Sequence, residues 1–242
     1  MTHCQNCDHQ ISENYCSHCG NPAKIKRINS HYISHELFHL FHIEKGFLYN
    51  VRELFLRPAN SIKEFILVNR NKHMKPIGFL VFCGIIYGFI HSYYKPEIPL
   101  NTDESYFKGS TVEAIQHWQE KHFAYTYIIR SFFIAFWVKL FFKKYNYNFF
   151  EIMTLMCFVF GQGMLIVGML LPFHSLLHQT ANNILLISTT VLYPVIVVAQ
   201  FFDKTKIVNY LKALLTYFLG GIALFFVTVV IGLTVDFIIK LF

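Results

Sequence analysis

The feature that most constrains this chain is a series of long apolar runs, which begins near residue 76 and continues almost to the last residue. Each run approaches the ~20 residues that a helix needs to cross a hydrocarbon layer about 30 Å thick. Charged residues make up only 14% of the chain, whereas an ordinary soluble domain has about 25%. We therefore predict an all-α membrane protein whose bundle occupies 76–242. Its five transmembrane helices are expected over 76–94, 123–142, 150–171, 184–202 and 213–237.

The lysines and arginines fall on alternate sides of these five spans. Ten of them precede the first span. Those that follow the second and fourth spans are Lys143, Lys144, Lys204, Lys206 and Lys212. The connection after the first span has more carboxylates than lysines, and 172–183 has no Lys or Arg. Because cytoplasmic flanks collect Lys and Arg, we predict a multi-pass inner (plasma) membrane protein with a cytoplasmic N-terminus and a C-terminus outside. This bias explains the net charge of +7 better than nucleic-acid binding does.

The polar side chains inside the predicted spans include Arg130, Gln162 and Asp236. A charged side chain is costly within the bilayer and needs a partner or a route to the surface. The five-span count puts Arg130 roughly 10 Å below the outer boundary and Asp236 near the outer end of the fifth span. We predict that Arg130 faces the bundle and pairs with Asp236. The alternative is that Arg130 reaches the headgroups and Asp236 is hydrated. In the fourth span, Pro194 is expected to be tolerated as a kink.

Residues 31–75 are too polar to span a membrane and too apolar for a linker. Helical segments there, interrupted near Gly46 and Pro58, have one broad apolar side. Its members are Leu37, Leu40, Phe41, Phe47, Leu48, Val51, Leu54 and Phe55. Such amphipathic helices lie at the membrane surface with the apolar face toward lipid. Docking against the cytosolic ends of the spanning helices is an equally good interpretation.

The first 22 residues contain two C-x2-C pairs. Two residues between thiolates allow a tight turn to aim both sulfurs at one tetrahedral ion, and two such turns make a four-cysteine site. A segment this short cannot bury enough apolar surface to fold alone, so metal binding would supply its folding energy. Reducing cytosol disfavours disulfides, and four thiolates leave no open position for catalysis. We predict an N-terminal zinc ribbon over 1–22, with structural zinc on Cys4, Cys7, Cys16 and Cys19.

The same cysteines carry a resemblance to a known family. The motif C-x2-C…YCS-x-CG is present as Cys4, Cys7, Tyr15, Cys16, Ser17, Cys19 and Gly20. A Gly-Phe turn, an Arg-Pro step and a basic stretch follow as Gly46, Phe47, Arg57, Pro58, Arg70, His73 and Pro76. In these positions the chain resembles a bacterial zinc-ribbon and multi-span membrane family known as domain of unknown function 3667. It departs from the family pattern at Asn21 and Asn50. The resemblance implies the architecture and no activity.

Two sets of histidines are candidate sites for pH sensing or weak metal binding. Four of them, His31, His35, His39 and His42, recur along one helix face, and imidazole titrates near neutral pH. A polar face at the headgroups or in water is the simpler interpretation. A second pair, His174 and His178, lies in the outer connection. On a helix these two could share a metal, but no nearby carboxylate offers a third ligand, so two interfacial histidines are the simpler interpretation.

Three classes of function remain open. We expect a membrane-anchored docking or regulatory protein whose cytosolic ribbon and basic N-terminal region recruit a protein or RNA partner. An antiviral role, as an accessory of phage defence such as RNA-targeting CRISPR systems, follows by analogy alone. The alternative is a homo-oligomeric pore or small-solute transporter lined by Arg130, Gln162 and Asp236. The chain has no HExxH, GxSxG or phosphate-binding glycine loop, so an enzyme is not expected.

Overall fold

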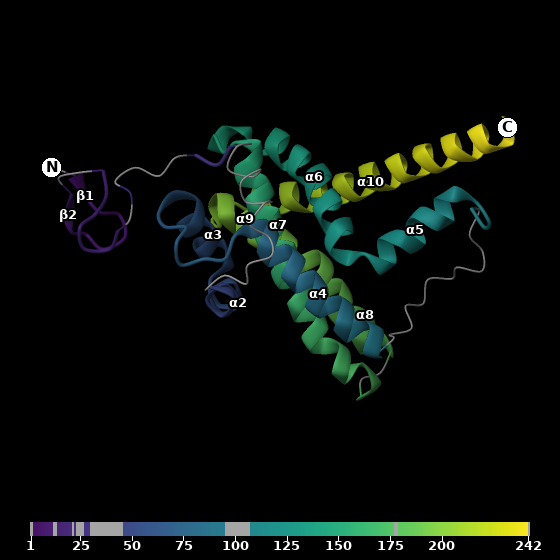
Figure 1. The fold of residues 1–242 in the computed structure, drawn as a ribbon, viewed down its shortest axis with the longest axis horizontal. Coiled ribbons are helices and arrows are strands. Elements are labelled where there is room, and N and C mark those ends of the chain that lie inside the picture. The colour runs from purple at the N-terminus through teal and green to yellow at the C-terminus, as the bar shows by residue number, and fades with distance from the viewer. Residues whose placement is uncertain are drawn as a thin grey trace.

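The computed structural model describes residues 2–11, 14–20, 22, 27–29, 46–94, 107–176 and 179–241. Its two short strands, β1 (Thr2–His3) and β2 (Gln10–Ile11), pair antiparallel. Two helices precede the bundle, α2 (Phe47–Leu56) and α3 (Pro58–Leu67). The remaining helices are α4 (Pro76–Tyr94), α5 (Thr111–Lys121), α6 (Phe123–Phe141), α7 (Phe149–Leu170), α8 (Gln179–Ile187), α9 (Tyr193–Asp203) and α10 (Ile207–Leu241). Short turns connect some of them: η2 (Lys143–Tyr145), η3 (Leu171–Leu176) and the π-helix η4 (Ser188–Leu192). The strands lie at one end of the molecule and the C-terminus at the other (Figure 1).

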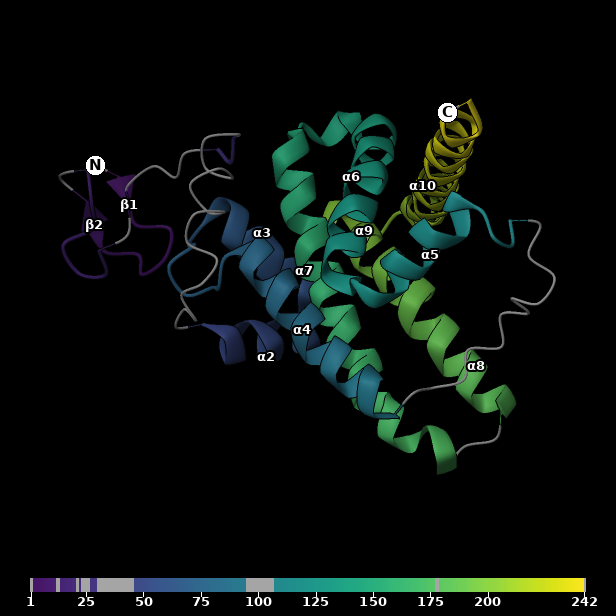
Figure 2. The ribbon, with the colours of Figure 1, turned by 45° about the vertical axis from the view of Figure 1, so that its right-hand side comes forward.

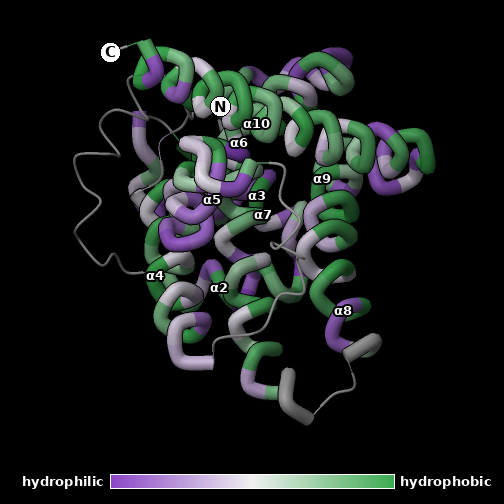
Figure 3. Tube along the Cα trace, turned by 90° about the vertical axis from the view of Figure 1, so that its right-hand side faces the viewer, coloured by the Kyte–Doolittle hydropathy of each residue, from purple (hydrophilic) through white to green (hydrophobic). Residues whose placement is uncertain are grey.

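Five helical segments are long and apolar enough to cross a membrane, which confirms the predicted number of spans. They are Pro76–Tyr94, Phe123–Phe141, Phe149–Phe173, Ala181–Asp203 and Ile207–Leu241. The fifth is longer at both ends than the predicted 213–237. Hydrophobic residues follow one another along α9 and α10 in Figure 3, as expected for helices that contact lipid. The described part of the chain is thus a multi-pass helical membrane protein.

The central helix of the bundle is α7. In the most apolar stretch of its spanning segment 78% of the residues are buried inside the protein, against 11% in that of α10. The helices α4, α6 and α9 contact it. Small residues permit close helix crossings in membranes. A Cβ on Gly161 of α7 would lie 2.8 Å from the Phe79 ring of α4. One on Gly220 of α10 would lie 2.9 Å from the Cα of Ile134 in α6.

The helices α2 and α3 dock against one end of the bundle. In α3, Phe65 is buried, and its ring centroid lies 5.1 Å from that of Phe158 in α7. The same helix contacts α9. These contacts support the docking interpretation of this segment, while the exposed side chains of Leu48 and Phe55 leave an apolar surface suited to the headgroup region. The part of the predicted segment in 31–45 lies outside the described residues.

Pro194 interrupts the fourth spanning segment, which consists of α8, the π-helix η4 and α9. Proline has no N–H, so it cannot donate to the carbonyl of Thr190, four residues earlier. The hydroxyl of Tyr217 in α10 donates to that carbonyl at 2.6 Å. A neighbouring helix therefore satisfies the backbone group that proline leaves open, as spanning helices with proline require.

The predicted pair between Arg130 and Asp236 is wrong. The guanidinium of Arg130 lies over the ring of Tyr217, 4.8 Å from its centroid, a contact that stabilises a partly desolvated cation. The carboxylate of Asp236 accepts a hydrogen bond from the backbone N–H of Thr111 at 3.0 Å and another from the Thr111 hydroxyl. Tyr217 and Asp236 are 19 positions apart on α10, which is roughly 28 Å at the helical rise.

The reason for this difference is α5, which lies in a connection where no helix was expected. It runs along the C-terminal half of α10 (Figures 1 and 2). The first N–H groups of a helix have no partner within it, and a carboxylate is favourable there. Asp236 fills this role for α5. One turn earlier on α10, a Cβ on Gly232 would lie 2.8 Å from the backbone nitrogen of Val112, so α5 rests directly on α10.

Candidate metal centre and its attachment to the bundle

The four N-terminal cysteines lie in two turns of the same form. The N–H of Asp8 donates to the carbonyl of Cys4 at 2.8 Å, and the N–H of Gly20 donates to the carbonyl of Cys16 at 2.8 Å. Asp8 and Gly20 each follow the second cysteine of a pair and have positive φ, 58° and 69°. This backbone fold points both sulfurs of each pair to the same side, as the C-x2-C spacing predicts.

The sulfurs of the two turns converge on one point. The Sγ atoms of Cys4 and Cys19 are 3.6 Å apart, as are those of Cys7 and Cys16, and all four lie within 4.8 Å of one another. A tetrahedral ion with metal–sulfur bonds of ~2.3 Å needs sulfurs about 3.8 Å apart. The geometry and the all-sulfur donor set therefore fit one metal ion held by the four cysteines that the sequence singled out.

The Cys7 thiol resists ionisation unless a cation is beside it. The N–H of His9 lowers the pKa of the Cys7 thiol, but burial and the three neighbouring thiols outweigh it and raise the pKa to about 12. A bound dication reverses this balance, because a coordinating thiol is deprotonated outright. Binding of the metal would thus convert the four thiols to the thiolates that coordinate it.

The chain that leaves the metal centre is attached to the bundle by an arginine. The Nε of Arg27 donates to Glu151 Oε1 at 3.0 Å, and Nη2 donates to Glu151 Oε2 at 2.8 Å. The same Nη2 donates to the carbonyl of Asn146 at 2.7 Å. Such bidentate pairs are among the stronger polar contacts in proteins. Glu151 holds the pKa of Arg27 above its ordinary value through these bonds and its charge.

Two further contacts hold the same region. The side chain of Asn148 donates to the carbonyl of Ile28 at 2.8 Å, and Ile28 is 0% exposed. Asn69, just after α3, donates to the side chain of Asn6 in the first cysteine turn at 3.1 Å. Sequence reasoning missed this attachment. The one visible signal was Asn148-x-x-Glu151, which forms a capping box at the start of α7 and so places the Glu151 carboxylate at a helix terminus.

The segment from Gly46 to Pro76 contains a buried polar core. Asn50 and His73 are 0% and 4% exposed. The Nδ1 of His73 donates to Asn50 Oδ1 at 2.9 Å, and Asn50 Nδ2 donates to the carbonyl of Met74 at 3.2 Å. At the start of α2, Gly46 has a φ of 131°, and a Cβ there would lie 2.9 Å from the carbonyl oxygen of Lys72. Gly46 therefore lets α2 pack directly on the connection before α4.

A comparison with protein families finds one match within this part of the chain. Residues 44–88 match the family described as protein of unknown function (DUF3667). The DUF3667 match covers α2, α3 and most of α4, and it includes Gly46, Arg57, His73 and Pro76 of the resemblance noted above. The cysteine cluster precedes it. No curated protein and no solved structure matches the chain.

Asn50, where this chain departs from the pattern expected for DUF3667, is the partner of His73. Burial lowers the pKa of His73 to about 4, and Lys72 and Arg57 lower it as well, while Glu53 raises it. The imidazole is therefore neutral at pH 7. His73 lies in the connection between α3 and α4, outside the spanning segments.

We expect this histidine to make the protein less stable as the pH falls from about 7 to 5. The unfolded imidazole binds a proton below its ordinary pKa of 6.5, whereas the folded one stays neutral down to about 4. The unfolded state therefore binds more protons in this window, and stability falls by about 1–2 kcal/mol. Thermal unfolding in detergent at both pH values, for the wild type and His73→Gln, measures the effect. The same pH dependence in both proteins would assign it to other groups.

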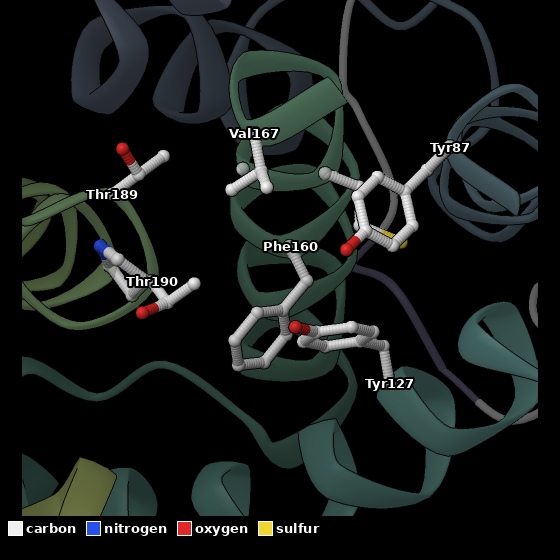
Figure 4. Close-up of a pocket in the computed structure, with 9 residues that line it drawn as sticks. Tyr87, Tyr127, Phe160, Val167, Thr189 and Thr190 are labelled. Atoms are coloured by element: carbon white, nitrogen blue, oxygen red, sulfur yellow. The ribbon is translucent and has the colours of Figure 1, made fainter. Parts of the chain in front are cut away.

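A small cavity of about 30 Å³ lies among α4, α6, α7 and the fourth spanning segment. Figure 4 shows the side chains of Tyr87 and Tyr127 approaching it from one side and those of Thr189 and Thr190 from the other. A space of this size has room for about two water molecules, and its lining is more apolar than polar. It is too small to pass a solute.

The polar residues predicted to line a pore, Arg130, Gln162 and Asp236, do not line this cavity. Gln162 is buried in α7, and Arg130 and Asp236 are held apart by their separate partners, so the two charges do not line one path within a single chain. A pore stays a prediction that requires several copies. The histidines at 31, 35, 39, 42 and 178, and the side chain of His174, lie outside the described residues.

Proposed function

We propose that this chain is a membrane-anchored docking protein whose N-terminal ribbon holds a structural zinc ion and recruits a cytosolic protein. The observation that carries the proposal is the attachment of the ribbon to the bundle through Arg27 and Glu151. It keeps a small metal-folded module at the membrane surface. Thiolate ligands favour zinc among the common divalent ions of cells. Four of them fill its coordination sphere, so the metal stabilises the ribbon and leaves no position for a substrate.

The surface of the ribbon favours a protein partner over nucleic acid. Residues 1–22 contain no Lys or Arg, and nucleic-acid affinity depends on such cations. The exposed surface instead carries Tyr15, which is 66% exposed, and the stacked rings of His9 and His18, with centroids 5.4 Å apart. Aromatic side chains are enriched at the centres of protein interfaces. An antiviral setting for this partner stays a prediction by analogy.

The distribution of positive charge supports a cytosolic partner. The ribbon precedes the ten Lys and Arg residues that lie before the first span, and the positive-inside rule puts that flank in the cytoplasm. In this orientation the five spans leave the C-terminus outside. Reporter fusions at the two ends are expected to report opposite sides.

Crosslinking from the ribbon surface tests the proposal. With a photoreactive phenylalanine analogue in place of Tyr15, we expect a discrete crosslinked protein in intact cells. Cys16→Ser removes a metal ligand and is expected to abolish that product. The same analogue in place of Tyr125, which is 59% exposed on α6, is the matched control and should not give it. A nuclease-sensitive product would indicate RNA instead, and a product that survives Cys16→Ser would contradict recruitment by the folded ribbon.

A further inference from the structure

A polar cleft of about 540 Å³ lies where the corner between α2 and α3 meets the connection between α9 and α10. Asn60 and Lys63 line it from α3, and Gln200, Lys204 and Thr205 line it from the other side. The cleft is far along the chain from the cysteines, and its chemistry is independent of the docking function proposed above.

The carboxylates around this cleft already have cationic partners. Asp203 pairs with Lys206 at 2.7 Å and accepts hydrogen bonds from Thr205. On the other wall, Arg57 pairs with Glu53 and, at 3.4 Å, with Glu64. These pairs offset much of the negative charge near the cleft, although Arg57 faces two carboxylates.

Two lysines of the cleft remain without such a partner. In the described part of the chain, neither Lys63 nor Lys204 forms an ion pair with a carboxylate. Lys63 is half-buried, and its Nζ lies 5.7 Å from the ring centroid of Phe201. The side chain of Asn60 is a further polar group at the same cleft. Arg57 and the Asp203 carboxylate, which pairs with Lys206, also line the cleft, so its cationic side chains outnumber its carboxylate. Cationic groups of this kind favour contact with a phosphate-bearing anion.

The surroundings of the cleft indicate that this anion is a lipid. The first turns of α10 begin beside it, and Ile207 and Leu211 are 77% and 64% exposed. Leu56, which lines the cleft itself, is 66% exposed. A soluble phosphate has no apolar part that could cover these side chains, whereas the acyl chains of a lipid would bury them. Basic pockets between spanning helices on the cytoplasmic side bind anionic headgroups.

We propose that this cleft binds the headgroup of an anionic phospholipid. Lys63 and Lys204 contact the phosphate, and the acyl chains lie along the exposed residues at the start of α10. The bound lipid joins the α2–α3 corner to α9 and α10 at the membrane surface.

Lipid titration of the full-length protein in neutral detergent tests this site. Phosphatidylglycerol and phosphatidylcholine with identical acyl chains are added, and bound lipid is counted by native mass spectrometry. We expect phosphatidylglycerol to bind more tightly. The double variant Lys63→Gln/Lys204→Gln should weaken its binding by roughly fivefold for each lysine, or about 25-fold together. The matched control, Lys143→Gln/Lys144→Gln, removes the same charge from η2 and should change the affinity less than about twofold.

Several results would overturn the proposal. Equal affinity for the two lipids removes the headgroup specificity, and an equal loss in the control variant assigns the effect to general surface charge. Displacement of phosphatidylglycerol by millimolar inorganic phosphate would make the cleft a site for a free anion. If the double variant does not fold, Asn60→Glu places a negative charge in the cleft from an exposed position. Unchanged phosphatidylglycerol affinity in that variant also contradicts the site.

Discussion

Removal of the metal from the four-cysteine cluster is expected to unfold the N-terminal ribbon and leave the bundle folded. The buried apolar residues of this cluster are Cys4, Cys16 and Ile11 alone among the described residues, and the paired strands have two residues each. Metal binding must therefore supply nearly all of the folding free energy, on the order of 10–16 kcal/mol for a structural zinc. Cys16→Ser, or a strong chelator, should abolish the protection of amides in residues 2–20 against hydrogen exchange.

Metal analysis of the same proteins identifies the ion. We expect one zinc ion per chain in the wild type and loss of most of it in Cys16→Ser. Cys83→Ser is the matched control, because this thiol is buried in α4 and its change should leave the metal content intact. Less than half an equivalent of zinc in metal-replete wild type, or a ribbon that stays protected without metal, would contradict a zinc-folded module.

The features that were predictable from sequence are those encoded within one segment. The spans followed from the length of their apolar runs, and the metal site followed from two cysteine pairs whose spacing itself determines where the sulfurs point. The C-x2-C turns need no distant partner to form. The contacts of Arg27 with Glu151 join residues 124 positions apart. The sequence around either residue does not indicate that the two side chains meet.

The predicted pair of Arg130 and Asp236 was wrong for the same reason, because it depended on how distant helices pack. The five-span count gave a depth for each charge along its own helix, but it gave neither the crossing of α6 with α10 nor the position of α5. The start of α5 did carry a signal, because Ser110-x-x-Glu113 has the spacing of a capping box. With that helix placed in the connection, an unpaired helix N-terminus becomes a competitor of Arg130 for the carboxylate. Sequence also gave no reason to pair Arg130 with an aromatic ring.

The last prediction concerns the attachment of the ribbon to the bundle. Arg27→Ala is expected to destabilise the contact between residues 27–29 and the start of α7. The side chain of Glu151 is only 4% exposed, and an uncompensated buried carboxylate costs about 3–5 kcal/mol. Since the side chain of Arg27 is 62% exposed, water screens one side of the pair, and we expect about 2–3 kcal/mol. Hydrogen exchange of residues 27–29 and of the first turn of α7 measures it.

A double-mutant cycle separates this pair from the capping role of Glu151. The carboxylate also accepts the N–H of Asn148 at 2.7 Å, so Glu151→Gln weakens both the cap and the attachment. If Arg27 and Glu151 act together, the double variant loses less stability than the sum of the single variants, and the difference is their coupling energy. Arg52→Ala, on the exposed side of α2, is the control for loss of an arginine. Additive effects would mean that the bidentate geometry does not attach the ribbon. Coupling with full zinc content in every variant would show that the metal folds the ribbon while the Arg27–Glu151 pair holds it at the membrane, two separate requirements of a docking module.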